Sequence, residues 1–116
     1  MRHALPVIVV LLSLAPLAHA HRGSAKLVTV ERTSDGAVVD VELESVDVAV
    51  SLGMDEDAPP EEVLARDAAI RAWLERGFSV RGAGGACSLH AEAPEGIEVD
   101  GQPRVRVRLV AECPSE

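Results

Sequence analysis

Two histidines are the residues of this sequence best suited to bind a transition metal. If the chain is cleaved after Ala20, His21 becomes the N-terminal residue, and its amino group and imidazole chelate Cu(II) in one ring. A second imidazole would strengthen such a site, and His90 is the only histidine that follows His21. The pattern predicts His21 and His90 as copper or nickel ligands. The simpler alternative, which we favour, is that His21 is a frayed terminus and that no cofactor is bound.

Basic residues alternate with apolar ones in the segment PRVRVRLVAECP, which places three of them on one face of a strand: Arg104, Arg106 and Arg108. On an acidic protein this face predicts contact with an anion or an acidic partner. Acidic residues show the same alternation in VVDVELES, so cross-strand ion pairs offer an alternative that we favour; these residues are Asp40, Glu42 and Glu44.

Acidic residues also gather in DEDAPPEE at 55–62, where carboxylates suit a hard cation such as Ca²⁺. The run lacks EF-hand spacing, so we interpret it as a solvated helix N-terminus. GAGG at 82–85 has no Lys-Ser or Lys-Thr after it and is interpreted as a turn. The sequence contains no Ser-His-Asp set, zinc-protease motif or paired-cysteine motif, and we expect no enzymatic activity.

Alternating apolar residues predict the strands that position these side chains. Strands are expected at 25–32 and 38–45, joined by Thr33-Ser34-Asp35-Gly36, whose Asp-Gly pair is typical of a hairpin. The apolar phase shifts after Ser45, so we expect the strand to bulge, bend or cross between layers there and continue through 46–52. Later strands are expected at 78–81, 87–93, 97–99 and 104–113.

Residues 60–76 predict one amphipathic helix. Pro60 suits a first helical position, and Val63, Ile70 and Leu74 fall on one face. The expected fold class is therefore α+β, with a mostly antiparallel sheet of about five strands and one amphipathic helix packed on it, or a partly closed sandwich.

The N-terminal segment has the three parts of a secretory signal peptide: basic residues 1–3, apolar residues 4–18, and the small-residue cleavage site Ala18-His19-Ala20. Fifteen helical residues span ~22 Å, which is less than a ~30 Å hydrocarbon core, although a retained N-terminal anchor is the alternative. We therefore expect a signal peptide at 1–20 and one small domain at 21–116. The domain is expected to be exported to the periplasm or the extracellular space, and not to span a membrane.

Charge and composition narrow the class of partner. The formal net charge is −8, and Trp73 and Phe78 are the only aromatic residues, so a nucleic-acid partner is not expected. The only cysteines, Cys87 and Cys113, lie on the apolar faces of their expected strands. In an oxidising compartment they predict one disulfide.

Several phrases of the sequence together resemble the N-terminal extracytoplasmic region of HupE/UreJ-like bacterial membrane proteins. These are the leader ending in AHAH, the run VDVELESVDVAVSLG, the helix ending AIRAWLERGFSV, and PRVRVRLVAECP. The resemblance implies a non-catalytic domain attached, in that family, to a multi-helix part associated with nickel or cobalt transport. Family members continue past the second cysteine with further strands and then transmembrane helices. The chain is then a standalone relative, a truncated form or a domain lacking C-terminal strands.

The sequence thus predicts a non-catalytic secreted or periplasmic interaction domain with an unidentified protein partner, for which the resemblance suggests a membrane protein. The alternative is a periplasmic copper- or nickel-binding protein that uses His21. An interaction domain predicts an apolar patch or an unpaired sheet edge where further strands would lie.

Overall fold

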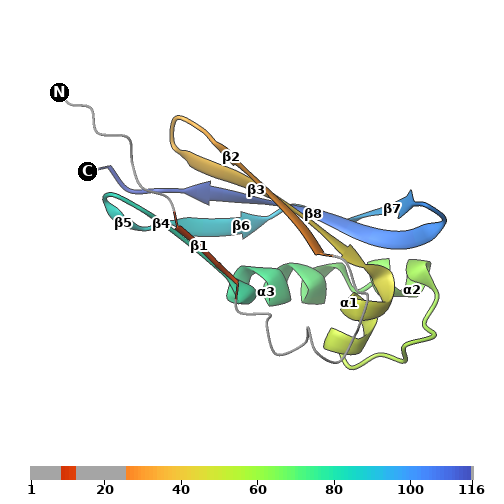
Figure 1. Ribbon diagram of the computed structural model, residues 1–116. Helices are drawn as coiled ribbons and strands as arrows, with labels where there is room; N and C mark the ends of the chain where they lie inside the picture. The colour runs from red at the N-terminus through yellow and green to blue at the C-terminus, as the bar shows by residue number, and fades with distance from the viewer. Residues whose placement is uncertain (1–8, 13–25, 116) are drawn as a thin grey trace.

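The computed structural model describes residues 9–12 and 26–115, and Figure 1 shows its helices gathered on one side of a long sheet. The helices are α1 (Ser45–Ser51), α2 (Pro60–Leu64) and α3 (Asp67–Gly77). The strands are β1 (Val9–Leu12), β2 (Lys26–Arg32), β3 (Gly36–Glu44), β4 (Phe78–Gly82), β5 (Gly85–Ala86), β6 (Ser88–Ala91), β7 (Glu95–Val99) and β8 (Gln102–Glu112). The arrangement confirms the predicted α+β class.

The larger sheet has five strands in the order β2-β3-β8-β6, and β7 also pairs with β8. Every pairing in it is antiparallel, and the central pair β3–β8 places Val41 opposite Val107 and Asp40 opposite Arg108. The sheet does not close on itself within the described residues, so it is not the partly closed sandwich that was the alternative. A second, smaller sheet has the order β1-β4-β5.

The core lies between the larger sheet and the helices. Strands β3 and β8 direct every second side chain toward the helices, and these side chains are almost fully buried. The helices meet them with residues that are fully buried: Val48, Val63, Ile70 and Leu74. The opposite face of β3 and β8 carries the charged residues of the alternation, so the period-two pattern separates the core from a charged outer face.

The predicted continuation of the strand through 46–52 is wrong, because Ser45–Ser51 form helix α1. Val48 and Ala49 are buried while Val46 is 37% exposed, which is helical rather than strand spacing. The phase shift after Ser45 therefore marks a change of element rather than a bulge. The β-branched valines favour strands only weakly, and packing on the sheet overrides that preference.

The single helix predicted over 60–76 is also wrong, because the segment forms two helices that are separated at Ala65–Arg66. Arg66 has a non-helical ψ of 41°, and α3 begins at Asp67. Helix α2 packs on β7 and α1, whereas α3 packs on β6 and β4. Because of this interruption, the two halves of one amphipathic segment pack against different elements.

The predicted hairpin turn at 33–36 is confirmed. Thr33 N–H donates to Gly36 O at 3.0 Å and closes the β2–β3 hairpin. Asp100 and Gly101 both have positive φ, 52° and 78°, as a two-residue hairpin turn between β7 and β8 requires. In contrast, β6 is shorter than the expected strand over 87–93, and Ala93 is exposed instead of facing inward.

The predicted signal peptide lies outside the described residues except for Val9–Leu12, which form β1. Among the described helices, none has the length and apolar character needed to cross a membrane.

Candidate functional site

The predicted disulfide is present: Cys87 is bonded to Cys113. Cys87 directly precedes β6 and Cys113 directly follows β8, at the end of the sheet where Ser88 pairs with Glu112. The two cysteines are close because their strands are antiparallel neighbours. The described part of the chain contains no free cysteine, so the sulfur atoms here hold strands together.

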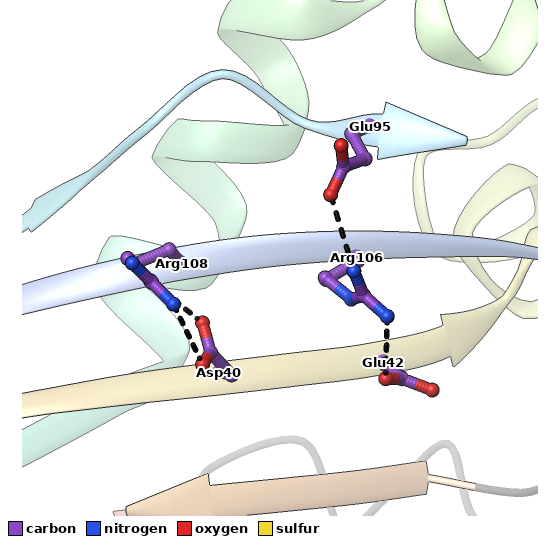
Figure 2. Close-up of polar contacts among 5 residues, drawn as sticks. All are labelled: Asp40, Glu42, Glu95, Arg106 and Arg108. Carbon is purple, nitrogen blue, oxygen red and sulfur yellow. Dashed lines mark hydrogen bonds and ion pairs between the residues drawn. The ribbon is translucent and has the colours of Figure 1, made fainter. Parts of the chain in front are cut away.

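Arg106 and Arg108 form the ion-pair ladder that the sequence analysis favoured, on the outer face of β3 and β8 (Figure 2). Arg108 Nε donates to Asp40 Oδ1 at 3.0 Å and Arg108 Nη2 donates to Asp40 Oδ2 at 3.2 Å. This hydrogen bonding, together with the charge of Asp40, raises the pKa of Arg108 above its ordinary value. Arg106 lies between Glu42 and Glu95, each at 3.4 Å. Both guanidinium groups are neutralised within the protein.

Arg104 differs from the other two arginines. The register places it opposite Glu44, yet within the described part of the chain its side chain makes no ion pair and no hydrogen bond. Its Nε is buried without a hydrogen-bond partner. The hydroxyl of Ser45, a residue that is only 5% exposed, is also buried without a hydrogen-bond partner.

Arg104 and Ser45 line one cavity of about 310 Å³, between the start of α1, α2 and the β7–β8 hairpin. The remaining lining is mostly apolar and includes Leu64, Ile97 and Pro103. Sequence reasoning identified Arg104 as a candidate anion contact but missed Ser45 as its neighbour in a site. The only sequence signal at Ser45 was the change in apolar phase.

His90 lies exposed on β6, beside a shallow surface depression that Glu75 and Asp67 also line. Glu75 is already engaged, because its Oε2 accepts a hydrogen bond from Ala91 N at 2.7 Å. The described residues contain no group of three or more His, Cys, Asp or Glu side chains placed to hold a metal ion. The other predicted ligand, His21, lies outside the described residues, so the copper or nickel site remains a prediction.

The acidic residues of 55–62 are exposed around the start of α2. Asp55 Oδ1 accepts a hydrogen bond from Asp57 N at 3.1 Å, which organises the turn itself. This placement agrees with the interpretation of a solvated helix N-terminus. Of the sequence-predicted candidates in the described residues, Arg104 is the one with a buried polar atom, Nε, that has no hydrogen-bond partner.

No protein-family model, curated protein or solved structure matches this chain. The resemblance to HupE/UreJ-like proteins accordingly remains a prediction.

Proposed function

We propose that this protein is a non-catalytic interaction domain that acts outside the cytoplasm, and that the outer edge of β4 takes an extended apolar strand from a partner protein. One observation carries the proposal. The β4 edge holds such a strand in the structure, because β1 pairs with it antiparallel from Val9 opposite Arg81 to Leu12 opposite Phe78.

Strand β1 belongs to the segment that the sequence predicts to be removed. Cleavage after Ala20 would take Val9–Leu12 away and leave the outer backbone groups of Phe78–Arg81 without strand partners. The other edge of β4 is occupied, since β5 pairs with it and Cys87 N donates to Val80 O at 2.9 Å. Processing would thus open one edge of β4.

The occupant that suits this edge is apolar and extended. Val10 lies opposite Val80 and packs against the core, while Phe78 and Val80 are 5% and 3% exposed with β1 in place. Main-chain hydrogen bonds would hold a replacing strand, and an apolar side chain opposite Val80 would select it. In the family that the sequence resembles, this region is attached to a membrane part, and a membrane protein is the partner class we propose.

The disulfide supports an exported setting.

The first test is the N-terminus of the protein purified from the periplasm after expression of residues 1–116. Mass spectrometry should find a chain that begins at His21. A mature protein that still begins at Met1 would contradict the proposal, because its own β1 would occupy the edge.

The second test adds to the processed protein a synthetic peptide of residues 7–13, flanked by lysines for solubility. Hydrogen exchange should slow at the amides of 78–82. The matched control peptide carries Val10→Asp, which places a carboxylate against the core and should bind more than tenfold more weakly. Equal protection by both peptides, or protection by neither, would refute strand addition at β4.

A further inference from the structure

We propose that the cavity lined by Arg104 and Ser45 binds a small carboxylate whose organic part is apolar. The site uses none of the residues of the β4 edge, so it is independent of the function proposed above. It begins from Arg104 and Ser45, two residues that line the same cavity and that each contain a buried polar atom, Nε and Oγ, without a hydrogen-bond partner.

Both atoms donate hydrogen bonds, and both have been removed from water. A guanidinium N–H donates only, and a serine hydroxyl donates equally well to an anionic oxygen. Leaving such groups uncompensated is unfavourable, and an acceptor placed in the cavity would reverse that penalty. Among Arg104, Arg106 and Arg108, Arg104 is also the one that forms no ion pair in the described part of the chain, although Glu44 lies opposite it in the strand register.

The charge balance favours a single negative charge on the ligand. One guanidinium faces the cavity, and the exposed Glu98 lies on its lining. The net charge of the chain is −8, which disfavours a dianion such as phosphate. A carboxylate offers two oxygen atoms that match a guanidinium and a hydroxyl with one unit of charge.

The lining and the size of the cavity describe the rest of the ligand. Apolar groups come from three elements: Pro60 and Leu64 from α2, Ile97 from β7 and Pro103 from β8. The volume of about 310 Å³ is at the lower end of the range for small-molecule pockets, about 300–1,000 Å³, so the apolar part is compact. A branched short-chain acid has this chemistry, and so does the carboxyl terminus of a polypeptide that ends in leucine.

The test measures binding to the full purified chain by NMR amide shifts, with four probes. The probes are 4-methylpentanoate, acetyl-Gly-Gly-Leu with a free carboxylate, the same peptide as its amide, and inorganic phosphate. Saturable shifts in β7 and β8 are expected with 4-methylpentanoate, and binding of the free-acid peptide as well would identify a polypeptide terminus as the source. The amide and phosphate should bind at least tenfold more weakly. Equal binding by the acid and the amide, tighter binding of phosphate, or no saturation with any carboxylate would overturn the proposal.

Variants locate the site on the protein. Arg104→Gln should weaken 4-methylpentanoate binding about tenfold or more, and Ser45→Ala about fivefold. Arg108→Gln is the matched control, because it removes a guanidinium from the same strand that is already paired with Asp40. Its affinity should equal that of the unmodified chain. A loss with Arg108→Gln as large as with Arg104→Gln would show general charge attraction and refute the site. The comparison of acid and amide on the unmodified chain decides the matter even if Arg104→Gln does not fold.

Discussion

Breaking the Cys87–Cys113 disulfide should lower the free energy of unfolding by about 3.5 kcal/mol. The two cysteines are 26 residues apart in the chain, and the chain-entropy relation gives this value for the conformational freedom that the unfolded protein regains. Native contacts at this end of the sheet remain without the link, since β6 still pairs with β8 and Glu75 still accepts a hydrogen bond from Ala91 N. Most of the effect therefore falls on the unfolded chain.

The assay is urea unfolding followed by the fluorescence of Trp73, the only tryptophan, which is half-buried against the core. With a denaturant slope of about 1.5–2 kcal/mol per molar urea for a domain of this size, the midpoint should fall by roughly 2 M. The total free energy of unfolding of a small domain is about 5–15 kcal/mol, so this loss is a large share of the stability.

Two independent changes should give the same result: reduction with dithiothreitol, and the double substitution Cys87→Ala with Cys113→Ala. The double variant should show no further response to dithiothreitol. If neither change moves the midpoint, the entropy argument is refuted. If thiol labelling of the unfolded, unreduced protein finds two reactive thiols, the disulfide itself is absent from the protein.

Three further substitutions are predicted, all measured by the same urea unfolding. Ser45→Ala should raise the free energy of unfolding by about 1 kcal/mol, because it removes a buried hydroxyl with no partner, and a loss of stability would show that the hydroxyl is satisfied. Leu109→Ala should lower it by about 2–5 kcal/mol, because this fully buried side chain lies in the central strand β8, and a change below 1 kcal/mol would contradict that burial. Gly36→Ala should lower it by about 2 kcal/mol, since the added Cβ would collide with the backbone carbonyl of Ala111 on the paired strand, and wild-type stability would contradict the close approach.

The sheet was predictable because its signals are local and periodic. Alternation in 39–44 and 105–111 assigned the buried and the charged faces of β3 and β8, and the structure has the same assignment. The Asp-Gly pair at 35–36 marked the hairpin between β2 and β3. The disulfide followed because both cysteines shared the apolar phase of neighbouring strands.

The helical layer was harder to predict because packing decides it. Residues 45–51 carry valines that suit a strand, and only their burial against the sheet makes them helical. The helix break at Ala65–Arg66 contains no glycine or proline, so the sequence does not indicate it. Its cause is the need of α2 and α3 to contact different strands.

The cavity lined by Arg104 and Ser45 could not be predicted from local sequence patterns either, because packing between distant elements forms it. Arg104 has the same alternation as Arg106 and Arg108, and sequence alone does not separate the three. The separation comes from the way α2 and the β7–β8 hairpin enclose one end of β8 while its middle stays exposed beside Asp40 and Glu42. Such enclosure depends on elements far apart in the sequence.

The central pair β3–β8 has a consequence for how the protein is made. Asp40 and Arg108 are 68 residues apart, so the middle of the sheet forms only after β8 has been synthesised. Until β8 arrives, the β2–β3 hairpin has an apolar face and an unpaired edge but no core to join. Strand β8 also leads directly into Cys113, so its pairing with β6 brings the second sulfur atom to the first.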